Sequence, residues 1–301
     1  MILNFDHDLP DHLRQIIKSF FNKTGITNEE RVAFEKISGG CINTCYRVTA
    51  RNNRSLLVKY NNADAFPGML KAEKTGLAFL QKQGIINIPE VLGFQQVNEN
   101  QVLILEWINE SKPNRDSWKK LGEQLAGLHQ VTNLQFGFEE DNYIGSLPQD
   151  NSWDEGWINF FVEHRLKPQI DLAIKKGLLT SHHSSLFKKL LIALPDIFDD
   201  EQPALLHGDL WRGNLLFDER QNPVLIDPAV YFGNRHMDLA MTTLFGGFDP
   251  AFYESYHYFY PLPKNHKQQW EICNLYPLLV HVNLFGESYV PKVRSVLKKF
   301  S

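Results

Sequence analysis

The sequence predicts an α+β fold in two unlike parts, and three observations support this prediction. Residues 1–108 hold short runs rich in β-branched and aromatic residues, which are typical of strands. Residues 109–301 mostly show the spacing of apolar side chains that predicts helices. The polar run Asn109–Pro113 between them has the composition of a connector. We therefore expect a β-rich N-terminal lobe, a helical C-terminal lobe and a ligand-binding cleft between the two.

The N-terminal part begins with a helical pattern and continues as strands. Apolar residues between Leu13 and Phe21 recur at helical spacing, and Gly25 ends that pattern. Strands are predicted next, because the apolar runs become shorter and turn residues separate them. The expected strands cover residues 34–37, 45–49, 55–60, 91–96 and 101–107, and a helix covers residues 69–83.

Helical patterns dominate the C-terminal part, with three short apolar runs among them. Pro277 lies inside one helical pattern and is expected to kink it. His182-His183 lies in a polar stretch that we expect to be an exposed loop. His129 stands at the end of a stripe of apolar residues at helical spacing, and we expect it to pack in the core or to cap the helix. Helices are expected from residue 117, over residues 153–176, and near residues 237, 252, 268 and 289. The inserted strands are expected at residues 204–206, 215–217 and 224–226.

The composition is that of an ordinary globular protein. Hydrophobic residues make up 43% of the chain and charged residues 22%, and the net charge is −4. No stretch gathers Lys and Arg, which argues against nucleic acid or an anionic membrane as the main partner. Three cysteines are too few for a disulfide framework, and neither a signal peptide nor a membrane-spanning run is present. We therefore expect a cytoplasmic protein.

The segment from His207 to Asn214 carries the strongest functional pattern. An apolar run leads into His207-Gly208-Asp209, Asn214 follows, and Asp227 ends a later apolar run. Phosphoryl transfer needs one carboxylate to accept the hydroxyl proton, and an amide oxygen with a second carboxylate to hold Mg²⁺ against the phosphates. The spacing equals that of the kinase catalytic loop. We therefore predict that Asp209 is the base and that Asn214 and Asp227 are magnesium ligands.

A plainer interpretation treats the same residues as turn formers, since Asp and Asn favour turns. It explains any one of Asp209, Asn214 and Asp227 as well as the catalytic interpretation does. It explains less well why all three occur at this spacing after apolar strands. The combination therefore favours catalysis.

Residues that suit nucleotide binding precede this motif in the chain. Gly39 and Gly40 join two predicted strands, where glycines let backbone amides approach a phosphate. Lys59 ends a predicted strand and is expected to contact the phosphates of ATP, and Glu73 on the next helix is placed to pair with it. Taken singly, each residue is explained at least as well by a turn or a solvated side chain. Their order along the chain is what favours a nucleotide site.

The end of the last N-terminal strand is expected to meet the adenine ring. Glu106, Trp107 and Ile108 stand there, immediately before the polar connector. Backbone groups of these residues would contact the nucleotide base.

Several segments match the motifs of one enzyme family. They are Leu206–Asn214, Ile226–Ala229, Met237–Met241, Leu244–Phe248, Asp141–Gly145 and Pro148-Gln149. Through them the chain resembles the fructosamine kinase (ketosamine-3-kinase) family along nearly its whole length. The resemblance implies a bilobal protein-kinase-like fold of the aminoglycoside phosphotransferase type, and ATP-dependent phosphorylation of the sugar 3-hydroxyl of a ketosamine. That 3-phosphate sheds its amine, so the implied outcome is deglycation of small amines or of proteins.

The resemblance implies further roles for single residues. Asp238, together with His207, would brace the catalytic loop, and Trp211 would form a flat wall for the sugar. Asp238 is equally compatible with a helix N-terminus, which favours carboxylates, and Trp211 with a buried core. Gly208 replaces the arginine of the protein-kinase motif His-Arg-Asp, which implies that switching by activation-loop phosphorylation is absent.

Cys41 directly follows the two glycines of the expected phosphate loop. Backbone amides and Lys59 nearby would favour its thiolate, and members of the resembling family also place a cysteine there, which fits redox control. The alternative is a small loop residue without a role. The sequence leaves open whether the protein is a monomer or a dimer.

Other classes of function remain open at this point. A related kinase for aminoglycosides or choline would keep the same base and magnesium ligands. A non-catalytic nucleotide-binding regulator would have no need of a base. A metal-dependent hydrolase built on His207, Asp209 and Asp227 would need further metal ligands, which the sequence does not offer at suitable spacing.

Overall fold

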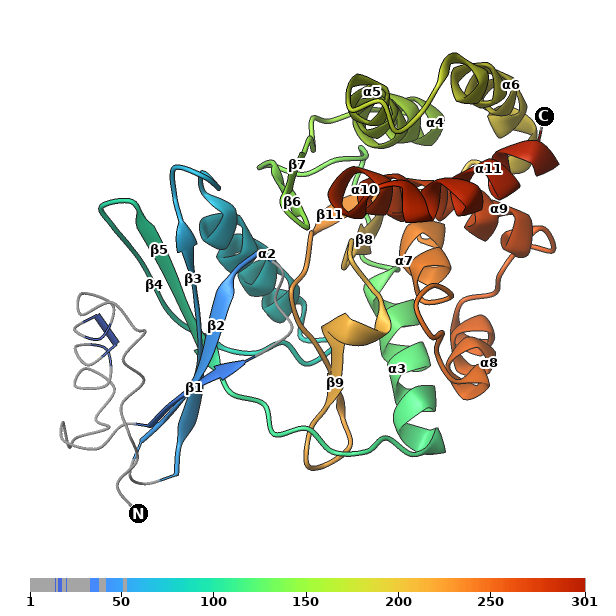
Figure 1. Ribbon diagram of the computed structural model, residues 1–301. Coiled ribbons are helices and arrows are strands. Elements are labelled where there is room, and N and C mark those ends of the chain that lie inside the picture. The colour runs from blue at the N-terminus through green and yellow to red at the C-terminus, as the bar shows by residue number, and fades with distance from the viewer. Residues whose placement is uncertain are drawn as a thin grey trace. The chain divides into compact units, whose positions relative to one another are not determined.

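The computed structural model describes residues 33–37, 42–50 and 53–300, together with Arg14, Ile16, Ile17 and Phe20. The chain divides into two compact units (Figure 1). These are Met1–Ala78 with Pro89–Ile108, and Phe79–Ile88 with Asn109–Ser301. The helix predicted between Leu13 and Gly25 lies outside the described residues apart from the four named ones, which are helical.

The described part of the first unit contains a five-stranded antiparallel sheet in the order β1-β2-β3-β5-β4. β4 carries an irregularity in its pairing between Val91 and Gly93. Each strand agrees with a predicted run to within two residues, and the predicted helix α2 is confirmed at both ends. The elements are β1 Ala33–Ile37, β2 Thr44–Thr49, β3 Ser55–Asn62, α2 Met69–Gln83, β4 Val91–Val97 and β5 Asn100–Glu106. The end of α2, from Phe79 on, is assigned to the second unit.

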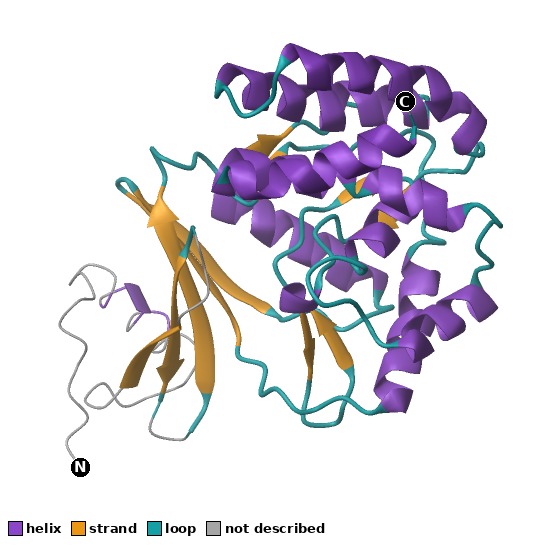
Figure 2. Cartoon of the chain, turned by 45° about the vertical axis from the view of Figure 1, so that its right-hand side comes forward, coloured by secondary structure: helices purple, strands orange, loops and turns teal. Residues whose placement is uncertain are grey.

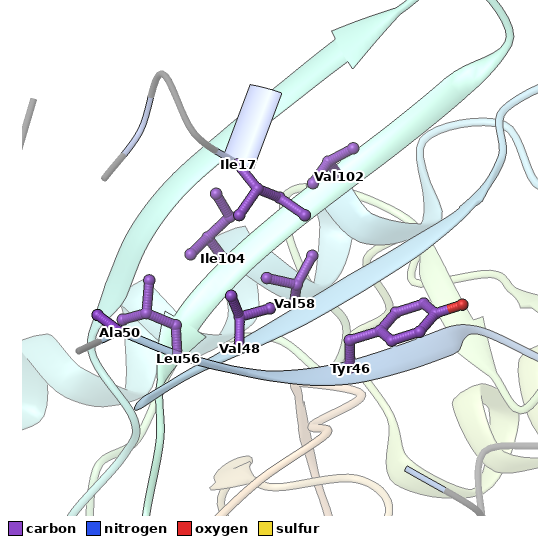
Figure 3. Close-up of a cluster of buried hydrophobic side chains, with 8 residues drawn as sticks. All are labelled: Ile17, Tyr46, Val48, Ala50, Leu56, Val58, Val102 and Ile104. Atoms are coloured by element: carbon purple, nitrogen blue, oxygen red, sulfur yellow. The ribbon is translucent and has the colours of Figure 1, made fainter. Parts of the chain in front are cut away.

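One face of this sheet forms a buried core (Figure 3). Alternate residues of a strand point to the same face, and alternate positions of β2, β3 and β5 supply this core. Its members are Ile17, Tyr46, Val48, Ala50, Leu56, Val58, Val102 and Ile104. Because Val58 faces this core, the next residue of β3, Lys59, faces the opposite side.

Helices dominate the second unit (Figure 2). The long pattern predicted from residue 268 breaks at Asn274, so Pro277 lies in the first turn of its helix, where a missing N–H costs no helical bond. None of the helices described is long and apolar enough to cross a membrane. The helical elements are α3 Arg115–Leu128, α4 Trp157–Phe160, the π-helix η1 Phe161–Leu166, α5 Lys167–Lys175, α6 Ser181–Ile197, the 3₁₀ turn η2 Arg212–Asn214, α7 His236–Met241, α8 Pro250–Phe259, α9 His266–Cys273, α10 Leu275–Phe285, the 3₁₀ turn η3 Glu287–Tyr289 and α11 Val290–Lys299.

Short strand pairs lie among these helices. β8 Ala204–Leu206 pairs with β11 Tyr231–Gly233, and β9 Leu215–Phe217 pairs with β10 Pro223–Leu225. These include the three predicted runs, one of them shifted by a residue. The hairpin of β6 Asn142–Ile144 and β7 Leu147–Gln149, and the strand β11, were not predicted because three-residue strands leave almost no period to detect.

The loop predicted around His182-His183 is wrong. These residues lie in the first turn of α6, and His183 is buried. Thr180 caps the helix, and the His183 ring accepts a hydrogen bond from the Thr180 backbone N–H at 3.1 Å. The histidine thus takes the place that Glu or Gln has in a familiar capping box, so the usual signal for a helix start was missing from the sequence.

Candidate active site

The segment after β8 is shaped by a close backbone crossing at Gly208. This residue has φ +83°, a left-handed value that favours glycine. A Cβ atom at this position would stand 2.0 Å from the carbonyl oxygen of Ala229. Any side chain at 208 would therefore push the two segments apart. The departure from His-Arg-Asp noted in the sequence thus has a steric reason in this fold.

The carboxylate of Asp238 holds the backbone of His207 and Gly208 through two hydrogen bonds. Oδ2 accepts a hydrogen bond from the backbone N–H of His207 at 2.7 Å, and Oδ1 accepts one from Gly208 at 2.9 Å. Asp238 lies in the first turn of α7 and is 1% exposed. Asp238 thus ties α7 to the backbone that leads to Asp209, and its role in bracing a catalytic loop stays a prediction.

His129 adds a third contact to this carboxylate. Its Nε2 lies 3.3 Å from Oδ2 of Asp238, and its Nδ1 lies 2.9 Å from the hydroxyl of Tyr256. The ring is fully buried at the end of α3, in agreement with the expected packed or capping role. Its contact with Asp238 was not predicted, because nothing in the local sequence links residues so far apart.

The ring of His207 connects the segment to the strand end that carries Asp227. Its Nε2 lies 2.9 Å from the carbonyl oxygen of Ile226, and its Nδ1 accepts a hydrogen bond from the backbone N–H of Asp209 at 3.3 Å. Burial lowers the pKa of His207, so the ring is neutral at physiological pH. A neutral ring with its proton on Nε2 fits both contacts.

Asp209 lies half-buried at the end of this braced segment. The amide nitrogen of Asn214 donates to its Oδ2 at 2.8 Å and to its backbone carbonyl at 2.9 Å. Burial raises the pKa of Asp209 to about 7, and the charges of Asp227 and Asp238 add to this, while the bond from Asn214 opposes it. A carboxylate with a pKa near 7 is well matched to accept a proton at physiological pH.

Asn214 and Asp227 offer the oxygen atoms that Mg²⁺ prefers. Both hydrogen bonds from the Asn214 side chain to Asp209 use its nitrogen, which leaves the amide oxygen as the atom suited to a metal. The backbone N–H of Ile226 donates to the backbone carbonyl of Asn214 at 3.1 Å. This hydrogen bond links the chain just before Asp227 to Asn214, the second predicted ligand. These residues therefore fit a magnesium site.

The donor set also limits which metal chemistry is available. In the described part of the chain, no group of three or more His, Cys, Asp or Glu side chains could hold a metal ion. Mg²⁺ commonly uses one or two protein ligands and completes its shell with phosphates and water. One amide oxygen and one carboxylate are therefore a sufficient protein contribution to a nucleotide-bound Mg²⁺.

The first unit contains the expected pair of Lys59 and Glu73. Lys59 Nζ lies 2.6 Å from Oε1 of Glu73, which reaches β3 from α2. Their side chains are 4% and 10% exposed. Neither residue is the solvated side chain of the plainer interpretation. Pairing holds the ammonium in one position, as a phosphate-binding lysine requires.

The expected adenine-binding residues stand at the end of β5. The backbone N–H of Glu106 donates to the carbonyl of Glu90 at 2.9 Å, and the guanidinium of Arg47 lies 4.6 Å from the ring centre of Trp107. Ile108 is half-buried. Their contact with adenine stays a prediction. Gly39, Gly40 and Cys41 lie outside the described residues.

Trp211 is half-buried and so is not a core aromatic residue. Its ring covers the Cα of Gly213, where a Cβ would stand 2.3 Å from the indole. The ring meets the ring of Phe245 edge-on, with 6.1 Å between the ring centres. Phe245 in turn stacks on His281, with 4.5 Å between the ring centres. Trp211 thus belongs to an aromatic group that begins two residues from Asp209. Phe245 and His281 were not singled out, because only the fold brings them to Trp211.

Comparisons with known proteins show which family the chain resembles along most of its length. The chain is 38% identical over 266 residues to a candidate ketoamine kinase of Enterococcus faecium, across 88% of this chain and 94% of that one. A crystal structure of a candidate fructosamine-3-kinase from Thermobifida fusca superposes with a TM-score of 0.83 at 33% identity, and covers 95% of this chain and 98% of that one.

A more distant structure identifies the wider fold. The aminoglycoside phosphotransferase APH(2")-IIa, solved with gentamicin, superposes with a TM-score of 0.61 at 16% identity, and covers 97% of this chain and 94% of that one. The α+β, protein-kinase-like fold of the aminoglycoside phosphotransferase type is thereby confirmed. The model of the fructosamine kinase family matches residues 13–301. The chain therefore belongs to the fructosamine kinase family.

Proposed function

We propose that this protein is an ATP-dependent kinase that phosphorylates the sugar 3-hydroxyl of ketosamines of the fructosamine or ribulosamine type. The observation that carries the proposal is the geometry of Asp209, in a chain of the fructosamine kinase family. Its carboxylate is fixed by Asn214, and its pKa is raised to about 7. A regulator that only binds nucleotide needs no such base.

Each part of the site has a task in this reaction. Asp209 accepts the proton of the sugar hydroxyl as its oxygen attacks the γ-phosphorus of ATP, while the bond from that phosphorus to the β-phosphate oxygen breaks and ADP leaves. Asn214 and Asp227 hold Mg²⁺, which, when bound, neutralises charge on the phosphates. Lys59, positioned by Glu73, donates to phosphate oxygens.

The remaining predicted contacts complete the nucleotide and sugar sites. Backbone amides of Gly39 and Gly40 approach the phosphates, and the segment from Glu106 to Ile108 contacts adenine. Residues 1–108 thus form the nucleotide-binding lobe, and residues 109–301 form the catalytic and substrate-binding lobe. Trp211 provides a flat aromatic wall for the sugar, and Phe245, which meets it edge-on and stacks on His281, supports its ring.

The product explains the biological use of the reaction. A ketosamine 3-phosphate loses its amine, so the kinase frees the amine of a glycated small molecule or protein. We place this activity in the cytoplasm, which is reducing and suits a chain with three cysteines. Cys41, next to the phosphate loop, is a candidate site of redox control.

An assay of ATP consumption with a panel of acceptors tests the proposal. Fructosamines and ribulosamines should support turnover that depends on Mg²⁺. Choline and an aminoglycoside belong in the panel because a related kinase for either would use the same base and metal ligands. Turnover of one of those with none on ketosamines would move the assignment to that substrate class. No turnover on any acceptor, with intact nucleotide binding, would favour a regulator.

A further inference from the structure

A cluster of buried polar side chains lies beside the candidate active site in the second unit. Asn142 of β6 and Gln149 of β7 face each other directly across their hairpin. Gln149 donates to Oδ1 of Asn142 at 2.7 Å, and the hydroxyl of Tyr276 on α10 donates to Oε1 of Gln149 at 2.7 Å. Their exposed fractions are 9%, 1% and 3% in the order Asn142, Gln149, Tyr276. None of the three has a task in the proposed reaction.

The cluster bonds to the backbone that follows Asp227. Asn142 donates to the carbonyl of Val230 at 2.8 Å, and Gln149 donates to the carbonyl of Ala229 at 3.4 Å. The N–H of Ala229 donates in the other direction, to the carbonyl of His207 at 2.8 Å. The peptide groups around Ala229 are thus held by the cluster on one side and by the catalytic segment on the other.

Asp227 needs such support because its backbone is strained. Its φ of +54° lies in the left-handed region, which is unfavourable for a residue with a side chain. Strained backbone of this kind persists only where the surrounding structure holds it in place. The residues before it are fixed by Asn214 and His207, and the residues after it by the cluster.

The hairpin itself is anchored by a buried arginine. Arg165 of the π-helix η1 donates to the carbonyl of Asp150 at 2.5 Å and to the side chain of Asn151 at 2.7 Å. Its guanidinium lies 4.1 Å from the ring centre of Tyr231, the first residue of β11. Arg165 therefore ties Tyr231, where the segment after Asp227 enters β11, to the two residues that directly follow the hairpin. Asn142 and Gln149 therefore bond to that segment from a hairpin whose own position is fixed.

We propose that Asn142, Gln149 and Tyr276 form a positioning cluster that sets the backbone of Asp227, and so the geometry of the magnesium site. This proposal rests on the proposed function, because it assigns Asp227 to the metal. In this role the three residues act through the backbone around Asp227. They also explain why the motifs Asp141–Gly145 and Pro148-Gln149 accompany the catalytic motif in this chain.

The variant Gln149→Met tests the cluster, since it keeps the length of the side chain and removes its hydrogen bonds. Calorimetric titration of ADP with and without Mg²⁺ measures how much the metal strengthens nucleotide binding. We expect the metal-dependent gain to fall by about tenfold, which corresponds to the loss of one or two hydrogen bonds. Affinity for ADP alone should stay within about twofold, and higher Mg²⁺ should restore turnover.

Gln269→Met is the matched control. Gln269 is also 1% exposed and also donates to a backbone carbonyl, that of Ile197 at 3.0 Å, but it lies on α9. Both variants should lower the melting temperature, and only Gln149→Met should change the response to Mg²⁺. Equal melting losses with an unchanged Mg²⁺ response in Gln149→Met would overturn the proposal.

A second variant keeps the test decisive if Gln149→Met fails to fold. Tyr276→Phe removes one hydroxyl and should weaken the Mg²⁺ response in the same direction, by a smaller factor. An unchanged response in Tyr276→Phe would then overturn the positioning role. The readout needs no ketosamine. A protein that binds Mg·ADP and loses the metal response in these variants supports the cluster even if another acceptor proves to be the substrate.

Discussion

Asp209→Asn is expected to lower kcat by about 10² to 10⁴, which is the usual contribution of a general base. Asparagine keeps the size of the side chain and can still accept the hydrogen bond that Asn214 donates. The affinity for ATP should therefore remain close to that of the wild type. Turnover within about threefold of the wild type would contradict the assignment of the base.

The pH dependence of the wild-type enzyme gives an independent check on Asp209. The base must be ionised to act, and its pKa is about 7. The value of kcat/KM should therefore rise with pH up to about 7 and then level off. The free energy of unfolding should change in the opposite sense. The raised pKa of Asp209 means that its protonated form favours the folded state at low pH, and this contribution is lost as pH rises from about 4 to about 7.

Asp218→Asn is a suitable control for both measurements. Asp218 lies in the same unit and caps a turn by accepting the N–H groups of Arg220 and Asn222. Its loss should affect the turn and leave the pH profile of turnover unchanged. A wild-type profile without any limb near pH 7 would show that Asp209 is not the group that limits the reaction.

Gly208→Ala is expected to have the second large effect. The added Cβ would meet the carbonyl oxygen of Ala229 at 2.0 Å, a contact with backbone that no rotamer can relieve. The left-handed conformation alone costs an alanine about 1–2 kcal/mol, and the overlap adds a cost of similar size. Since Asp209 is the next residue, a shift of about 1 Å should lower kcat by about 10²-fold.

Gly177→Ala separates the overlap from the backbone strain. Gly177 has a similar φ of +73°, but a Cβ there would have nothing within 4 Å. This control should lose about 1–2 kcal/mol of stability and keep its turnover. If Gly208→Ala behaves like Gly177→Ala, the crossing with Ala229 does not position the base.

The local parts of the fold were the parts that the sequence could predict. α2 was predicted at both ends because fifteen residues hold several helical turns of one pattern. Lys59 and Glu73 were predicted to pair because a strand and the next helix are neighbours in most folds of this kind, and the structure contains the pair. Asp238 was linked to the catalytic loop only through the family resemblance.

Contacts between distant segments were beyond the reach of the sequence. The need for glycine at 208 depends on a carbonyl group of Ala229, and the support of Asp238 by His129 joins two helices. Asn142 and Gln149 appeared only as members of matching motifs, since their partners come from the segment before β11 and from α10. Such contacts leave no period or spacing in the chain, because they are set by how the elements pack.

The position of the new phosphate tests the central proposal most directly. The purified protein, incubated with a fructosamine, ATP and Mg²⁺, should give a product in which phosphorus and proton NMR place the phosphate on the 3-oxygen of the sugar. The amine should then be released over time, as a ketosamine 3-phosphate requires. A stable product with the phosphate on any other oxygen, or transfer to water alone, would contradict a ketosamine 3-kinase.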